Sequence, residues 1–254
     1  LLQPGLKVET LCFKDEKEFV GVNNLIQLEE IEKELRLRKV QSLQLEGVRF
    51  LNSDSVYIED SVQISAGATV YGNVNLYGGT KISAGVVIES GTTIKDSVIS
   101  EDVLIKSNSY LEGVQIGKSS VVGPMARLRE GTVIKEECKI GNFVETKKST
   151  LENGVKVSHL SYVGDAEIGE NTNIGCGFIT CNYDGANKHK TIIGKDSFVG
   201  SDCQMIAPVT IGDEAYIGSG STINKNVPDG AFAIARERQS TKEGMAKRFI
   251  KKKS

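Results

Sequence analysis

Aliphatic residues recur every six positions over two long stretches of this chain, and this spacing decides what it can fold into. The first stretch runs from Ile58 to Ile94 and the second from Ile193 to Ile223, with a small or β-branched residue two positions before each aliphatic one. A helix would scatter a period of six around its axis, whereas positions i−2 and i of an extended strand point to the same face. The repeating unit is therefore a very short strand followed by a corner.

Glycine marks the corners, because it often follows the aliphatic residue directly, as at Gly117, Gly141, Gly175 and Gly218. Glycine allows a sharp bend without a Cβ clash. A strand that buries only two side chains is not stable alone, so successive coils must stack on one another. The sequence thus predicts a mainly β protein, a parallel β-solenoid, with room for roughly nine coils between positions 56 and 227.

Two segments depart from the six-residue repeat. Between Asn24 and Gly47, apolar residues follow helical spacing with glutamates between them, which predicts one helix with Asn24 as N-cap and Gly47 as its stop. From Thr180 to Lys190 no aliphatic residue stands at the expected positions. We expect a loop that leaves the solenoid there, and its mixture of amide, aromatic and basic groups suits a binding loop.

Composition excludes several classes of protein. Apolar runs of only a few residues cannot span a bilayer, and no secretory signal is present, so we expect no membrane partner. A net charge of −2, from 31 basic and 33 acidic residues, argues against a nucleic-acid partner. Five cysteines without a C-x-x-C pair indicate reduced thiols, and hence a cytoplasmic protein. The basic stretch from Lys242 to Ser254 is either a solvated tail or a phosphate contact.

Of the two histidines, His159 and His189, the first follows a core position and should project outward. A lone histidine is more often a surface residue than a catalytic one. Near it, however, are groups that a solenoid wall does not require: Arg127, Arg129, Lys147, Lys148, Tyr162, Asn173 and Asn182. An imidazole among them could act as a general base. The cations, amides and phenol together suggest an anionic, hydroxyl-rich ligand such as a sugar phosphate.

Four segments carry a resemblance to a known family: 123–129, 141–148, 159–169 and 179–194. They resemble the C-terminal half of the bacterial bifunctional N-acetylglucosamine-1-phosphate uridyltransferase/glucosamine-1-phosphate N-acetyltransferase family, which carries hexapeptide repeats. The resemblance implies a left-handed β-helix, the opposite of the usual crossover hand. It divides the chain into a remnant of the uridyltransferase domain (1–22), a helical linker arm (23–47), the acetyltransferase β-helix (48–235) and a basic tail (236–254).

The same resemblance implies roles for individual residues in acetyl transfer from acetyl-CoA to glucosamine 1-phosphate. Phosphate and sugar would be held by Arg129, Lys147, Tyr162 and Lys188, with Asn173 at the sugar and Glu145 near the amine. His159 would take the proton from the attacking amine. The backbone near Cys176 would stabilise the oxyanion, and the acetyl-CoA site would be lined by Asn182, Tyr183, Ser201, Ser219, Arg236 and Lys242.

The resemblance also implies properties of the whole assembly. Family members are homotrimers with each site between neighbouring subunits, and they supply UDP-N-acetylglucosamine for peptidoglycan and lipopolysaccharide. Asn23 would help to hold Mg2+ only in an intact uridyltransferase domain, and the Gly-rich nucleotide loop of that domain is absent from this sequence. Cys176 stands where the family commonly has alanine, and we expect it to be a tolerated substitution rather than a covalent catalyst.

Three alternative functions differ in what they require of the sequence. A zinc-dependent carbonic anhydrase of the same fold needs three histidine ligands, and two cannot supply them. A hexapeptide acyltransferase for another amino sugar fits the cations in part, and acceptor profiling would separate it. A non-catalytic solenoid scaffold predicts no dependence on His159 and no binding of acetyl-CoA.

Overall fold

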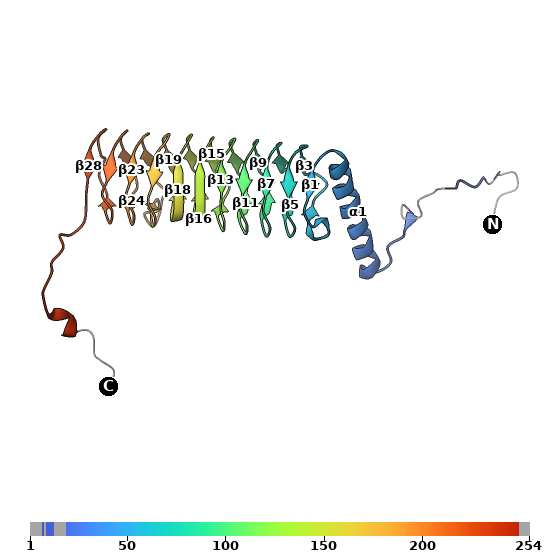
Figure 1. Cartoon of the computed structure of the whole chain (residues 1–254), viewed down its shortest axis with the longest axis horizontal. Helices are drawn as coiled ribbons and strands as arrows, with labels where there is room; N and C mark the ends of the chain where they lie inside the picture. The colour runs from blue at the N-terminus through green and yellow to red at the C-terminus, as the bar shows by residue number, and fades with distance from the viewer. Residues whose placement is uncertain (1–6, 8, 13–18, 249–254) are drawn as a thin grey trace.

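A computed structural model describes residues 7, 9–12 and 19–248 and shows a column of stacked coils with one long helix at its N-terminal end (Figure 1). The coils form three faces, each a stack of short parallel strands. The first face stacks β1 (Arg49–Phe50), β4 (Thr69–Val70), β7 (Val87–Ile88), β10 (Leu104–Ile105), β13 (Val121–Val122), β16 (Lys139–Lys147), β18 (Lys156–Gly164), β20 (Asn173–Ile174), β23 (Phe198–Val199), β26 (Tyr216–Ile217) and β28 (Phe232–Ala233).

The other two faces follow the same rule, in which each strand pairs in parallel with the strand one coil away. The second face stacks β2 (Tyr57–Ile58), β5 (Asn75–Tyr77), β8 (Thr93–Lys95), β11 (Tyr110–Glu112), β14 (Arg127–Leu128), the ends of β16 and β18, β21 (Ile179–Cys181), β24 (Gln204–Ile206) and β27 (Thr222–Ile223). The third face stacks β3 (Gln63–Ile64), β6 (Lys81–Ile82), β9 (Val98–Ile99), β12 (Gln115–Ile116), β15 (Val133–Ile134), β17 (Thr150–Leu151), β19 (Ala166–Ile168), β22 (Thr191–Ile193) and β25 (Val209–Ile211).

The predicted solenoid is therefore confirmed, with about ten coils in the described residues rather than nine, because β1 begins before position 56 and β28 ends after position 227. The predicted departure near Thr180 is also confirmed. The strand β21 ends at Cys181, and β22 begins only at Thr191. The intervening segment, residues 182–190, is called the loop below.

Two strands differ from the rest in length. Both β16 and β18 have nine residues and continue unbroken from the first face around the corner to the second. For this reason the first two faces join into one sheet of 19 strands, whereas the third is a separate sheet of nine in the described chain.

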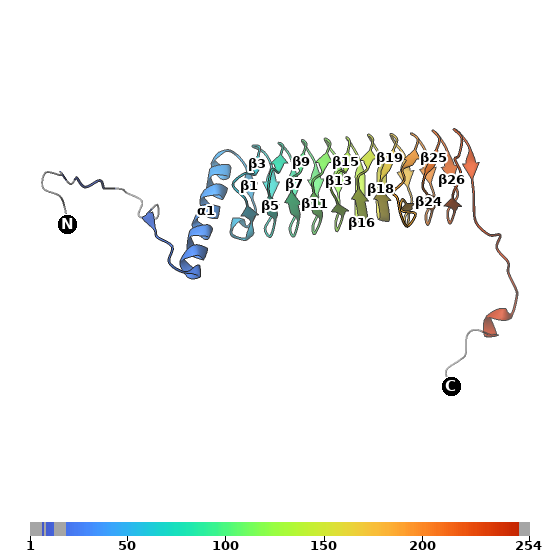
Figure 2. The ribbon, with the colours of Figure 1, turned by 180° about the vertical axis from the view of Figure 1, so that it is seen from behind.

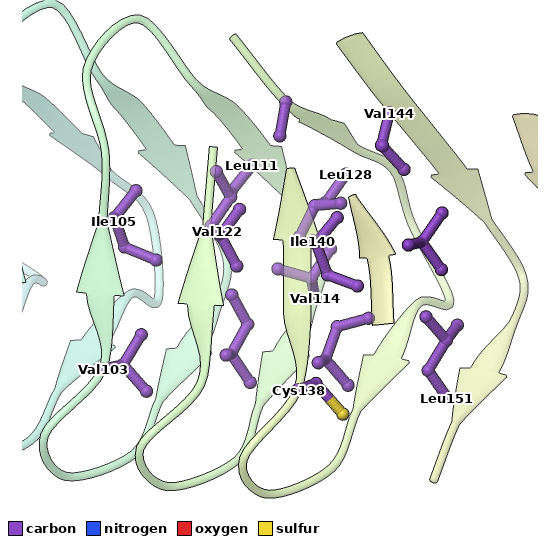
Figure 3. Close-up of a cluster of buried hydrophobic side chains, with 14 of the residues drawn as sticks. Val103, Ile105, Leu111, Val114, Val122, Leu128, Cys138, Ile140, Val144 and Leu151 are labelled. Carbon is purple, nitrogen blue, oxygen red and sulfur yellow. The ribbon is translucent and has the colours of Figure 1, made fainter. Parts of the chain in front are cut away.

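The core is a continuous column of aliphatic side chains, about one from each strand, as Figure 3 shows for Ile105, Val122 and Ile140. These side chains are fully buried. Hydroxyl groups complete the corners from inside: Ser120 Oγ donates to the Lys135 carbonyl at 2.8 Å. Burial raises the pKa of the core thiol of Cys138 to about 11, so this cysteine is an unreactive part of the packing.

The helix α1 (Leu25–Leu45) begins as predicted, because the Asn24 side chain accepts the backbone N–H of Gln27 at 3.0 Å. Fewer residues of its apolar stripe are buried than the helical spacing suggests. Val40 and Leu43, near the C-terminal end, are buried, whereas Leu35 is 59% exposed. The helix touches the solenoid through its last turns, and Gly47 then turns the chain with a φ of +98°.

The chain leaves the column at its far end. After β28 it extends away from the coils to a short 3-10 helix, η3 (Met245–Arg248), as both views show (Figures 1 and 2). A second 3-10 turn, η2 (Ser53–Ser55), lies in the first coil. None of the helices in the described residues is both long and apolar enough to cross a bilayer.

Candidate active site

His159 lies on the corner where β18 passes from the first to the second face, and its side chain is exposed. The ring makes one hydrogen bond in the described chain, from Nδ1 to Asn142 Oδ1 at 2.9 Å. Asn142 is the partner of His159 in the ladder between β16 and β18. The second ring nitrogen, Nε2, is left free toward solvent.

Cations gather on the second face beside this corner. The pKa of Lys147 is lowered, first by the charge of Arg129 and then by that of Lys188, which shows that these three side chains share one electrostatic environment. Lys188 comes from the loop, whereas Arg129 follows β14 and Lys147 ends β16. Like charges held together in this way favour an anion between them.

Tyr162 and Glu145 lie next to these cations. The two residues are paired between β18 and β16, and Arg129 donates to Glu145 Oε1 at 2.7 Å. The Tyr162 ring folds over Gly164, where an added Cβ would lie 2.5 Å from the phenol oxygen. Since Gly164 is the ladder partner of Lys147, the phenol points toward the cations.

The loop has its own internal framework. Asp184 accepts the backbone N–H groups of Ala186 and Asn187 at 2.8 and 2.6 Å and pairs with His189 at 2.6 Å. The Asn187 amide and the His189 contact hold the pKa of the Asp184 carboxyl well below its usual range. A pocket of about 190 Å³ lies at the base of the loop, lined by Lys148, Asp165, Lys188, His189 and Lys190.

The loop is anchored at its base. The side chain of Asn182 is buried and donates to the Asp165 carboxylate, and Lys190 pairs with Glu167. Tyr183 is 61% exposed, and its hydroxyl donates to the Gly185 carbonyl at 2.6 Å. The two ends of the loop are thus fixed to the solenoid, and its basic side chains project from a defined base.

A line of exposed residues continues along the His159 corner toward the C-terminal end. His159, Cys176, Ser201 and Ser219 each stand two residues after a core residue of the first face, and these core residues pair coil to coil. Arg236 follows one coil further, close to Gly220. The backbone N–H of Cys176 has no hydrogen-bond partner among the described residues, so a free donor lies one coil from His159.

The structure does not bring every predicted residue to this corner. Asn173 lies on the first face, across the corner from Tyr162. Lys242 is exposed in the segment that leaves the column, and Asn23 is exposed just before α1, at the opposite end (Figure 1). In the described residues no cluster of three His, Cys, Asp or Glu side chains could hold a metal.

Sequence reasoning missed two features of the site. One is Asn142, whose contact with His159 spans two coils and leaves no mark in the six-residue repeat. The other is an apolar ridge beside His159, formed by Met125, Phe143 and Leu160, which are 47%, 55% and 60% exposed. All three have positive φ angles, which bulky residues rarely adopt, and this was not visible in the sequence.

Comparisons with known proteins agree with this architecture. Residues 52–138 match the family model described as the GMPPB C-terminal domain, and residues 190–225 match that of the bacterial transferase hexapeptide. The chain is 47% identical over 248 residues to the bifunctional protein GlmU of Staphylococcus epidermidis and 44% identical over 250 residues to that of Pelobacter propionicus. Both alignments cover 98% of this chain.

A solved structure gives a more distant likeness. LpxA, a UDP-N-acetylglucosamine acyltransferase from Bacteroides fragilis, aligns over 68% of each chain with a TM-score of 0.39 and 16% identity.

The coils, their corner residues and the matched repeat define a hexapeptide-repeat protein of the bacterial transferase class. More narrowly, the chain belongs to the GlmU family and corresponds to its C-terminal part. It spans about half the length of the curated relatives it matches, 55% and 54% in the two cases above.

Proposed function

We propose that this chain transfers the acetyl group of acetyl-CoA to the amine of glucosamine 1-phosphate, giving N-acetylglucosamine 1-phosphate on the route to UDP-N-acetylglucosamine. The observation that carries the proposal is the position of His159. Its Nε2 is free, and the residue stands on β18 three positions before Tyr162, which lies next to the cations, and at the start of the row of exposed corner residues. Homology to GlmU proteins over 98% of the chain supports the same assignment.

The cation cluster suits the phosphate of the acceptor. Arg129, Lys147 and Lys188 would contact its oxygens, and a dianion between them would relieve the repulsion that lowers the pKa of Lys147. Tyr162 and Asn173 would hydrogen bond to sugar hydroxyls. Glu145, already held by Arg129, would lie near the sugar amine.

The chemistry follows from the free nitrogen of His159. A protonated amine is not a nucleophile, so Nε2 would remove a proton as the nitrogen attacks the thioester carbon. A C–N bond forms, the C–S bond breaks, and the imidazolium returns a proton to the leaving thiolate. The unpaired N–H of Cys176 would donate to the oxyanion, a contact worth about 3 kcal/mol in other enzymes.

Acetyl-CoA would lie along the corner beyond His159. Ser201 and Ser219 would face its pantetheine arm, Arg236 and Lys242 its phosphates, and Asn182 and Tyr183 would enclose it from the loop. Lys242 would need the segment after β28 to fold toward the site. We propose that the reaction takes place in the cytoplasm, where free cysteines such as those of this chain persist.

The uridyltransferase reaction is not proposed for this chain. Asn23 has no cluster of carboxylates near it in the described residues, so a Mg2+ ion does not fit there and no step is assigned to it. We propose that residues 1–22 belong to a uridyltransferase domain, 23–47 to a linker arm, 48–235 to the acetyltransferase and 236–254 to a basic tail. Positions 1–6, 8, 13–18 and 249–254 lie outside the described residues.

We also propose a homotrimer with sites between subunits. The ridge of Met125, Phe143 and Leu160 supports it, because three exposed apolar side chains beside the base suit a second copy of the chain. The loop would reach across the same boundary. Leu160→Asp should lower the mass measured by analytical ultracentrifugation, and an unchanged mass would argue against this interface.

The test of the proposed function is a thiol-release assay with acetyl-CoA and a panel of amino sugars, each with and without a 1-phosphate. We expect turnover with glucosamine 1-phosphate and a loss of about 10²- to 10⁴-fold in His159→Ala. The melting temperature should not change, since His159 is exposed. Ser107→Ala is the matched control, because Ser107 occupies the same corner position as His159 three coils earlier, with Pro124 and Asn142 at that position in the two coils between them.

Other results of this assay would favour one of the alternatives. Turnover with a different amine would favour another hexapeptide acyltransferase, and no turnover or acetyl-CoA binding would favour the scaffold. Near-normal turnover in His159→Ala would show that the base is another group.

A further inference from the structure

The His159 ring has one partner, and that partner is an uncharged amide. Asn142 Oδ1 lies 2.9 Å from Nδ1, and no other group in the described residues hydrogen bonds to the ring. The other titratable groups on the strands around this corner are Lys139, Glu145 and Lys147 on β16 and Lys156 and Tyr162 on β18, with Cys176 in the next coil. Of these, Glu145 is engaged with Arg129. The contact with Asn142 is therefore the feature that orients the ring.

The backbone is shaped to make this contact. At the other corners the chain turns between short strands, but β16 and β18 run unbroken around this corner, so Asn142 and His159 stand as ladder partners. Gly141 permits the close approach, because an added Cβ would lie 1.8 Å from the carbonyl oxygen of Ser158. This is backbone against backbone, so no side-chain movement could relieve the clash.

The chemistry of the pair fixes the proton. A neutral imidazole has one N–H donor and one acceptor nitrogen, and an amide oxygen can only accept. With Oδ1 toward the ring, Nδ1 carries the proton and Nε2 keeps its lone pair. We propose that Asn142 is a positioning residue, which holds His159 in the Nδ1–H tautomer and so makes Nε2 the base. This inference deepens the proposed function and rests on it.

The neutral amide has a further consequence. A carboxylate partner would stabilise the imidazolium and hold its proton more tightly. An amide orients the ring without adding that charge, so it does not itself hold the proton that the ring must later return to the leaving thiolate. Asn142→Asp should keep the orientation but favour the charged ring, whereas Asn142→Ala should remove the orientation.

The experiment is NMR of the full chain labelled with 15N-histidine, combined with kinetics. With two histidines in the sequence, His189→Gln assigns both sets of ring signals. We expect His159 in the wild type to show the Nδ1–H tautomer, and Asn142→Ala to show a mixture. The kcat should fall about ten- to a hundredfold in Asn142→Ala, with little change in the KM for the sugar phosphate. In Asn142→Asp the acidic limb of the kcat profile should move to higher pH.

The outcomes separate the two proposals. Ser107→Ala, the corner control, should leave both the tautomer and kcat unchanged. If the wild type transfers acetyl groups and Asn142→Ala keeps the same tautomer and kcat, only the role of Asn142 would be overturned. An Nε2–H tautomer in the active wild type would have the same meaning, and it is the result expected if the Asn142 amide is reversed. A wild type without any acetyl transfer would overturn the proposed function, and the catalytic meaning of this contact with it.

Discussion

The coils of residues 81–122, the regular coils, and those of residues 123–199, the site coils, share one core but differ at their corners. Ile105 in the first group and Ile140 in the second are both fully buried, and their strands continue the same face. In the regular coils the non-glycine residues with positive φ are Asp96, Asp102, Asn108 and Ser119. These are small polar residues, and Asn and Asp tolerate the left-handed region best.

At the corner position of Asn108 the site coils place Met125, Phe143 and Leu160 in that region, whereas their other corners again use small polar residues such as Asp165 and Asn171. Each bulky residue there costs of the order of 1–3 kcal/mol. The site coils also contain the two nine-residue strands and the loop. The comparison teaches that the interior preserves the shape of the column, whereas the corners carry what is specific to the site. Substitutions at matched positions of the two groups can test this.

The largest difference should come from glycines. Gly141→Ala forces the backbones of β16 and β18 apart, and we expect it to lower the free energy of unfolding by about 3 kcal/mol and to reduce kcat at least a hundredfold. In Gly79→Ala, just before the regular coils, the added Cβ meets nothing closer than 3.8 Å. Urea denaturation should find that control within about 0.5 kcal/mol of wild type. Equal losses in the two variants would contradict the special role of the site corner.

The next comparison uses two lysines at one coil position. Lys95 pairs with Glu112 at 3.1 Å, and this hydrogen bond raises its pKa, whereas Arg129 and Lys188 lower the pKa of Lys147. A lowered lysine pKa means that the ammonium loses its proton at a lower pH than usual. Binding of N-acetylglucosamine 1-phosphate, whose nitrogen does not titrate, should therefore weaken about tenfold as the pH rises through that pKa.

Calorimetry across the alkaline range checks this dependence. Lys147→Arg retains the charge and should move the weakening to higher pH, whereas Lys95→Ala should leave the profile unchanged. A profile that is flat in the wild type would remove Lys147 from the anion site.

The third comparison exchanges corner residues. Asn108→Leu introduces a bulky residue at a φ of +60°, and we expect it to destabilise the regular coil by about 1 kcal/mol. Leu160→Asn should stabilise an isolated subunit by a similar amount and weaken association between copies. Thermal melts at several protein concentrations measure both effects. A Leu160→Asn variant that melts lower at every concentration, without loss of association, would show that the strain argument is wrong.

The smallest effect should come from the loop, which the regular coils lack. Asp184 caps its turn, and because its pKa is depressed the stabilisation is present above the unfolded pKa and is lost only as the pH falls through the folded one. The loop is therefore capped at neutral pH. Asp184→Asn should raise the KM for the sugar phosphate about two- to threefold through Lys188. Hydrogen exchange in residues 182–190 should increase as well, and unchanged exchange would rule out the cap.

The sequence predicted the column because each strand buries one aliphatic residue, and these residues recur every six positions. It predicted the exposure of His159 for the same reason. It predicted the start of the helix because Asn24 is a typical N-cap residue. The unbroken strands could not be predicted, since Ile140 and Thr146, like Val157 and Val163, keep the spacing of six although the corner between them is different.

The contacts between side chains of different coils also could not be predicted from the sequence. The pairs Asn142 with His159 and Arg129 with Glu145 join residues 17 and 16 positions apart, and which residues meet depends on the length of each coil. The burial of the helical stripe was overestimated for a different reason. The spacing shows that one face of the helix is apolar, but it does not show what covers that face. Leu35 belongs to that stripe and is mostly exposed.

The unpaired backbone N–H of Cys176 has counterparts at Ser201 and Ser219, which likewise have no partner for this group in the described chain. Stacking repeats them at intervals of about 4.8 Å along one edge. An extended amide-containing chain laid along that edge would meet a new donor at every coil. Inserting or deleting one coil would then shift the far end of such a chain by a fixed step while its reactive end stayed at the imidazole.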